Sequence, residues 1–150
     1  MTENTENTEK VQLTVDVVCI RGGNEVLLIE RGWPPYKGRL ALPGGYVDPD
    51  DENRRAAAVR ELREETGVRV AAEDLIRVGT FDAPGRDPRG RYITRAYLVT
   101  VPSGTTAKAD TDAAAVQWVP MAAVLADRAE NLAFDHHAIV TAAWRKSITH

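Results

Sequence analysis

The fold and chemistry expected of this chain rest on residues 60–67, RELREETG. They close a stretch, residues 53–66, dominated by the strong helix formers Ala, Leu, Arg and Glu, and the glycine that follows is a typical helix end. On a helix, Glu61 lies three residues before Glu64 and four before Glu65, so the three carboxylates share or border one face. Such a run is typical of a solvated surface, but hard divalent cations also prefer oxygen ligands.

The loop before this helix makes a metal site the stronger interpretation. Residues 42–45, LPGG, allow close approach of the backbone, because Gly44 and Gly45 carry no Cβ. An acidic segment, residues 48–52, then leads into the helix. Alone, a Pro-Gly-Gly turn favours a tight turn and nothing more. Turn, acidic loop and glutamate cluster together predict a site for a metal ion and phosphate groups.

This combination resembles the Nudix hydrolase family, whose box is G-x5-E-x7-R-E-U-x-E-E-x-G-U, where U is apolar. Residues 60–68 match the second half in full, and Glu52 stands at the glutamate position before Arg60. Six residues rather than five separate Gly45 from Glu52. Either the loop carries the extra residue, or Asp51 takes the glutamate's place and the extra residue opens the helix. A loop accommodates an insertion more easily than a helix, so we align Gly45 with Glu52.

The resemblance implies the fold and the cofactor. The fold class is α/β (α+β), a Nudix α/β/α sandwich with a mixed β-sheet. The cofactor is Mg²⁺ or Mn²⁺, with Glu61, Glu64 and Glu65 as metal ligands and the Gly45 carbonyl as a further ligand. Divalent ions clamp diphosphate oxygens and lower the pKa of bound water, which agrees with this implication.

The resemblance also implies catalytic roles for Glu64, Arg60 and Glu52. We expect Arg60 to orient other groups by pairing with Glu52 or with neighbouring carboxylates. The base that takes the proton from water stays open between a helix glutamate and a carboxylate of a distant loop, such as Asp112.

Further segments resemble the ADP-ribose pyrophosphatase-like branch of Nudix proteins. They are residues 35–45, 84–91 and 132–136, and they extend the resemblance over most of the chain. Leu40 departs from the pattern, because that branch often has Trp there.

This second resemblance implies that Arg86, Asp87, Arg89 and Tyr46 bind substrate. Guanidinium groups suit phosphate and ribose oxygens, although a solvated loop with internal ion pairs explains the same residues. Tyr46 and Trp33 could stack a base, although lone aromatic residues more often pack.

Composition excludes several classes of protein. The 150 residues are 43% hydrophobic and 27% charged, with a net charge of −3, which suits one globular domain over 11–150 after a disordered tail at 1–10. We expect no nucleic-acid partner, no membrane partner and a cytoplasmic location, and a homodimer stays open. One cysteine, Cys19, is expected in the core, and adjacent His136 and His137 are not expected to share a metal.

The pattern of apolar residues predicts further elements. Strands are expected at 11–20, 25–30, 75–82, 92–101 and 115–119, and helices at 120–126 and 134–146, with Asp135 as an N-cap.

The expected function is Mg²⁺-dependent hydrolysis of the diphosphate linkage of a small-molecule nucleotide substrate, with ADP-ribose giving AMP and ribose 5-phosphate. One alternative is a nucleoside-triphosphate pyrophosphatase that clears modified nucleotides. A second is a nucleotide-sugar sensor that does not cleave its ligand. Sensors usually show a broken box or an added DNA-binding domain, and all box carboxylates are present here.

Overall fold

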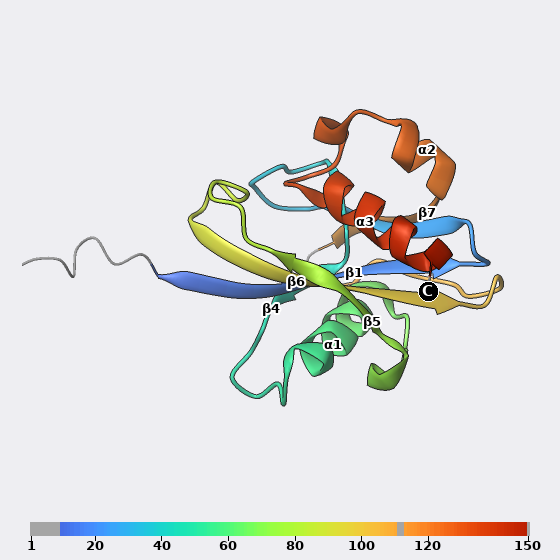
Figure 1. Ribbon diagram of the computed structural model, residues 1–150, viewed down its shortest axis with the longest axis horizontal. Helices are drawn as coiled ribbons and strands as arrows, with labels where there is room; N and C mark the ends of the chain where they lie inside the picture. Colours follow the sequence, from blue (N-terminus) through green and yellow to red (C-terminus); the bar gives the residue numbers. More distant parts are fainter. Residues whose placement is uncertain (1–9, 111–112, 150) are drawn as a thin grey trace, which may run out of the picture.

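The computed structural model describes residues 10–110 and 113–149, and within them a mixed sheet lies between two helical layers (Figure 1). Its strands are β1 (Val11–Arg21), β2 (Glu25–Arg31), β3 (Leu40–Ala41), β4 (Gly44–Tyr46), β5 (Ile76–Phe81), β6 (Arg91–Val101) and β7 (Ala113–Pro120). Helix α1 (Arg54–Thr66) covers one face, and α2 (Met121–Ala126) and α3 (His136–Thr149) cover the other. Two short 3₁₀ helices are η2 (Ala72–Asp74) and η3 (Ala129–Asn131). The predicted sandwich with a mixed sheet is confirmed.

β4, which carries the glycine turn, pairs with a part of β1 that does not pair with β2. The order is β3-β2-β1-β6-β5, with β7 paired to β2. β1 and β6 run parallel over their whole length, whereas the other pairs are antiparallel. β1 pairs with β2 near Arg21 but with β4 at residues 14–16. Gly44 and Gly45 therefore lie directly beside β1, in the middle of the sheet.

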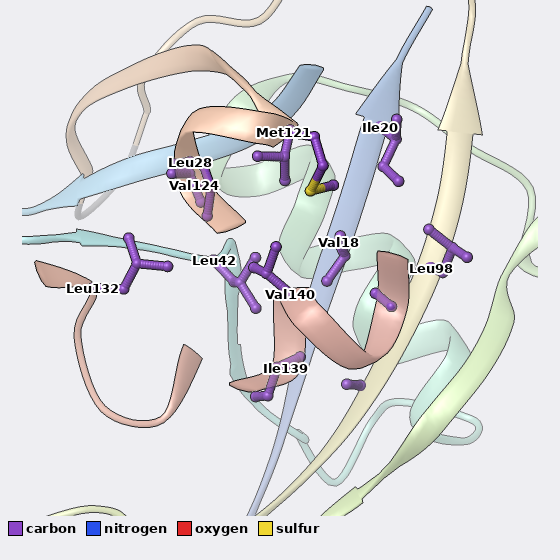
Figure 2. Close-up of a cluster of buried hydrophobic side chains, with 13 residues drawn as sticks. Val18, Ile20, Leu28, Leu42, Leu98, Met121, Val124, Leu132, Ile139 and Val140 are labelled. Atoms are coloured by element: carbon purple, nitrogen blue, oxygen red, sulfur yellow. The ribbon is translucent and has the colours of Figure 1, made fainter. Parts of the chain in front are cut away.

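Alternation along β1 divides the core into two layers, because successive side chains of a strand point to opposite faces. Val17 and Cys19 pack with α1, and burial raises the pKa of the Cys19 thiol to about 12. Val18 and Ile20 point the other way, toward α2 and α3 (Figure 2). The labelled partners of that second layer include Leu28, Leu42, Leu98, Met121, Val124, Leu132, Ile139 and Val140.

Helix α1 begins and ends where its capping residues stand. The Asn53 side chain accepts a hydrogen bond from the Ala56 N–H at 2.9 Å, and Gly67 has the left-handed φ of 76° that suits glycine at a helix end. The buried residues Ala58, Leu62 and Thr66 are spaced four apart, so one stripe faces the sheet. The glutamates of this helix are therefore held on a rigid, well-anchored element.

Most predicted elements agree with the structure to within two residues. α3 begins at His136 rather than at residue 134, and Phe134 has a left-handed φ of 53°. Asp135 stands directly before α3, at the predicted N-cap position, and its two carboxylate oxygens accept from Arg86 at 2.9 and 2.6 Å. Among the described residues, no helix is long and apolar enough to cross a membrane.

Candidate active site

A cleft of about 320 Å³ lies beside the glycine turn. Its walls come from β1, the end of β2 and the loop after it, β4, α1 and the β5–β6 loop. The lining residues are Thr14, Ile29, Arg31, Gly32, Trp33, Pro34, Gly44, Gly45, Tyr46, Glu61, Glu65 and Arg89. The cleft therefore brings two helix carboxylates and two arginines to one space, from segments far apart in the sequence.

The two glycines press the turn against β1 and α1. A Cβ on Gly45 would lie 2.3 Å from Oε2 of Glu61, and a Cβ on Gly44 would lie 2.1 Å from the carbonyl oxygen of Val15. Any side chain at either position would displace backbone or a carboxylate. The Gly44 N–H also donates to Oε1 of Glu65 at 2.8 Å. The absence of Cβ atoms thus sets how closely the turn approaches both carboxylates.

Glu61 is a largely buried carboxylate that lines the cleft. Its side chain is 14% exposed, and burial raises its pKa to about 7, although the neighbouring Arg60 guanidinium acts in the opposite direction. A buried carboxylate whose pKa is raised by burial suits a cation ligand.

Arg60 connects the acidic loop to the helix glutamates. It donates from Nε and Nη2 to the two oxygens of Asp51, both at 2.9 Å. Its Nη1 donates to Glu61 at 3.2 Å and to Glu64 at 3.0 Å, and Nη2 also reaches the Tyr46 carbonyl at 2.9 Å. The hydrogen bonds from Arg60 hold the pKa of the Asp51 carboxyl below its usual range. Arg60 is thus placed to orient its neighbours, as expected.

The structure favours Asp51, not Glu52, as the partner of Arg60. Glu52 is exposed, and within residues 10–110 and 113–149 its side chain makes no hydrogen bond or ion pair. The expected pairing of Arg60 with Glu52 is therefore not seen, and the role of Glu52 as the box glutamate stays a prediction. The five-residue spacing from Gly45 ends at Asp51, and the extra residue is taken up just before the Asn53 cap, where the chain is not yet helical.

Glu64 and Glu65 differ in their position relative to the cleft. Glu65 lines the cleft and accepts from the glycine turn. Glu64 is 42% exposed, pairs with Arg60, and is not among the residues that line the cleft. The structure therefore brings Glu61, Glu65 and Gly45 together and leaves Glu64 at the edge of the group.

The three predicted residues of the β5–β6 loop play unequal parts. Arg86 is 4% exposed and binds Asp135 through two hydrogen bonds, so it anchors its loop to the segment before α3. Asp87 is 3% exposed and holds Arg89 through both oxygens at 3.0 and 2.7 Å. Only Arg89, at 37% exposed, lines the cleft of the three.

Arg31 is a cleft residue that the sequence did not single out. Its guanidinium lies 4.9 Å from the centre of the Phe134 ring, and that of Arg89 lies 5.5 Å from the same ring. Burial, followed by repulsion from Arg89, lowers the pKa of Arg31. Two guanidiniums that lie close to one aromatic ring and repel each other suit an anionic ligand. The available signal was a cation directly after an apolar strand.

Aromatic side chains complete the cleft. Tyr46 lines it and is 43% exposed, and its hydroxyl lies 2.8 Å from that of Tyr92. This contact raises the pKa of Tyr92. Trp33 also lines the cleft and is 64% exposed. A flat base therefore has exposed rings available at the outer rim.

The donor set fits a hard divalent cation completed by a ligand. Within the described ranges, no three His, Cys, Asp or Glu side chains are grouped closely enough to hold a metal alone. Mg²⁺ commonly takes only one or two carboxylates, with water and substrate phosphates as the other ligands. Glu61 and Glu65 supply the carboxylates, beside a backbone that has no room for a Cβ. Asp112, considered as a base, lies outside the described residues.

Comparisons with protein families and with known proteins find a NUDIX domain in this chain. The family model for the NUDIX domain matches residues 10–141. The ADP-ribose pyrophosphatase of Methanocaldococcus jannaschii is 37% identical over 121 residues, which is 81% of this chain and 66% of that protein. The ADPR responsive transcriptional repressor NtrR of Acinetobacter baylyi is 33% identical over 138 residues, which is 89% of this chain and 53% of that protein. The chain thus spans about half to two thirds of these relatives.

A solved NUDIX domain has a similar structure. The NUDIX domain of Shewanella oneidensis NrtR, complexed with ADP ribose, superimposes with a TM-score of 0.81 at 29% identity. The match covers 97% of this chain and 94% of that one.

Proposed function

Because this chain belongs to the Nudix family, we propose that it hydrolyses, with a divalent cation, the diphosphate linkage of a nucleoside diphosphate joined to a second moiety. ADP-ribose is the substrate that we propose, with AMP and ribose 5-phosphate as the products. The observation that carries this proposal is that one cleft of about 320 Å³ is lined by two carboxylates and two guanidiniums. They belong to Glu61, Glu65, Arg31 and Arg89.

The charges of this cleft suit a diphosphate bound through a metal. A diphosphate presents several anionic oxygens in a small volume, and guanidinium groups bind such oxygens with two parallel hydrogen bonds. Carboxylates alone would repel the same ligand, so they need a cation between them and the phosphates. The cleft supplies both kinds of group, which is why a metal–diphosphate complex fits it better than either component alone.

The chain's own residues then have distinct parts in the reaction. Glu61 and Glu65 would hold Mg²⁺ or Mn²⁺, which supplies Lewis-acid clamping of phosphate oxygens and a lowered pKa of bound water. Arg31 and Arg89 hold phosphate oxygens away from the helix. Arg60 fixes Glu61 and Glu64 through hydrogen bonds, and we propose Glu64 as the group that accepts a proton from water. Water attacks one phosphorus, and the bond from that phosphorus to the bridging oxygen breaks.

The relatives support ADP-ribose as the substrate. One is named as an ADP-ribose pyrophosphatase, and the solved NrtR domain holds ADP ribose. Exposed rings of Trp33 and Tyr46 at the rim would receive the adenine, and the polar residues around Arg89 would receive the second ribose.

A ligand sensor is the second candidate, and a specific observation favours it. A relative at 33% identity is named as an ADPR responsive transcriptional repressor. The sensor and the enzyme share the cleft but differ in whether the bound diphosphate is cleaved. A nucleoside-triphosphate pyrophosphatase remains an alternative in which only the groups around the base and sugar differ.

The test is hydrolysis across a nucleotide panel, measured by chromatographic separation of the nucleotide products from the substrates. The panel holds ADP-ribose, NADH, sugar nucleotides, and common and oxidised nucleoside triphosphates, each with Mg²⁺ and with a chelator. We expect Mg²⁺-dependent cleavage of ADP-ribose above the others. Preference for a triphosphate would keep the chemistry and reject the substrate. Tight binding of ADP-ribose without cleavage would replace the enzyme by the sensor.

A further inference from the structure

His136, the first residue of α3, is buried beside the cleft and contacts the segment that leads into the glycine turn. Its Nδ1 accepts a hydrogen bond from the backbone N–H of Leu42 at 3.0 Å. Its Nε2 lies 3.4 Å from Oδ1 of Asp16 on β1. His136 and Asp16 are 4% and 6% exposed, so these contacts are shielded from water.

The hydrogen-bond partners fix the protonation state of this ring. A backbone N–H can only donate, so Nδ1 of His136 carries no proton. Burial lowers the pKa of His136, which also favours the neutral ring. The proton therefore lies on Nε2, which faces Asp16, and the other Asp16 oxygen accepts from the Thr94 hydroxyl at 2.7 Å. With both nitrogens engaged, the orientation of the ring is set by the surrounding protein.

The segment that His136 holds is continuous with the metal-facing part of the cleft. Leu42 is followed by Pro43, whose carbonyl accepts from β1 at 2.9 Å, and then by Gly44 and Gly45. Gly44 donates to Glu65, and Gly45 fits against Glu61 only because it lacks a Cβ. With so little free space, a shift of a few tenths of an ångström at Leu42 must be passed on to the turn.

We propose that His136 is a positioning residue for the hydrolysis: its unprotonated Nδ1 holds the Leu42 amide and thereby sets the distance between the glycine turn and the carboxylates of α1. His136 acts through Leu42 and not on the substrate. The expected effect on kcat rests on the proposed function. The expected effect on the position of the glycine turn does not, because it concerns the metal-free protein.

Substitution separates positioning from simple packing. His136→Leu keeps an apolar side chain of similar reach and removes the acceptor, whereas His136→Asn supplies an oxygen near the position of Nδ1. We expect kcat to fall roughly 10- to 100-fold in H136L with KM little changed, and to stay within about threefold of wild type in H136N. His137→Asn is the matched control, because His137 contacts the Val124 carbonyl at 3.0 Å and not the turn.

Three readouts do not depend on turnover. Long-range ¹H–¹⁵N spectra of the metal-free wild type should show the Nε2–H tautomer of His136. In H136L, the Gly44 and Gly45 amide signals should shift and the affinity for Mn²⁺, measured by calorimetry, should weaken. Neither change should appear in H136N or H137N. An Nδ1–H tautomer, or an H136L protein with unchanged kcat and Mn²⁺ affinity, would overturn the proposal.

The outcomes also separate this proposal from the proposed function. A wild type that cleaves no nucleotide rejects the enzyme, while the tautomer and the glycine amide shifts still decide the role of His136. Should H136L fail to fold, the tautomer of the wild type decides, together with the Gly44 and Gly45 amide signals of H136N, which should match those of wild type.

Discussion

At the scale of the residue, the site depends on which carboxylate meets Arg60. Asp51 is 7% exposed and receives two hydrogen bonds from Arg60, whereas the neighbouring Glu52 is exposed. We predict that Asp51→Asn lowers the free energy of unfolding by about 1–3 kcal/mol and lowers kcat roughly tenfold or more, because Arg60 loses its charged partner. Glu52→Gln is the control. Chemical denaturation and steady-state kinetics measure both effects, and a larger loss in E52Q than in D51N would restore the original alignment.

Glu61 provides the pH dependence. Burial raises its pKa from 4.5 to about 7, so the folded metal-free protein binds this proton more tightly than the unfolded chain does. Stability contributed by the protonated form is therefore lost as the pH rises from 4.5 through 7. Because Glu61→Gln has no charge to bury, its free energy of unfolding should rise relative to wild type between pH 5 and pH 8, by up to about 3 kcal/mol. Denaturation with a chelator present measures this difference, and a constant difference across that range would contradict the assignment.

Arg31 tests the anion side of the cleft. Arg31→Gln removes one of the two guanidiniums above Phe134, so we expect KM for the nucleotide to rise roughly 10- to 100-fold. Arg39→Gln is a matched control, since Arg39 lies over the Tyr36 ring and does not line the cleft. Equal KM values for both variants in steady-state assays would exclude Arg31 from substrate binding.

At the scale of the element, function depends on how closely β4 approaches α1. A Cβ on Gly45 would meet the Glu61 carboxylate at 2.3 Å, and relief requires that the helix carboxylate or the turn move. We predict that Gly45→Ala lowers both Mn²⁺ affinity and kcat, each roughly tenfold or more. Gly104→Ala is the control, because nothing lies within 4 Å of a Cβ there. Calorimetry and kinetics on both variants decide, and a G45A protein indistinguishable from G104A would show that close approach is unimportant.

At the scale of the whole molecule, the sequence predicted more of the fold than of the site. Strong local signals placed α1, since helix formers fill it and Asn53 and Gly67 close its ends. Short strands such as β3 and β4 were missed, because their pairing to β2 and β1 is set by partners distant in the chain.

The site needed tertiary information for the same reason. The carboxylates of α1 were found because helical spacing fixes their neighbours. Arg31, Asp16 and His136 were not, because the sheet and α3 bring them next to the glycine turn from separate parts of the chain. Arg86 and Asp87 were assigned to substrate, but each is buried in an ion pair whose partner the sequence alone could not identify.

The central claim is that the cleft holds a diphosphate through a divalent cation. The most direct measurement is calorimetric binding of a non-hydrolysable α,β-methylene analogue of ADP-ribose, with Mg²⁺ and with a chelator, to wild type and to Glu61→Gln. We expect Mg²⁺ to strengthen binding to wild type and this gain to disappear in E61Q, since the cation joins the helix carboxylates to the phosphates. Equal affinity with and without Mg²⁺ in the wild type would contradict it.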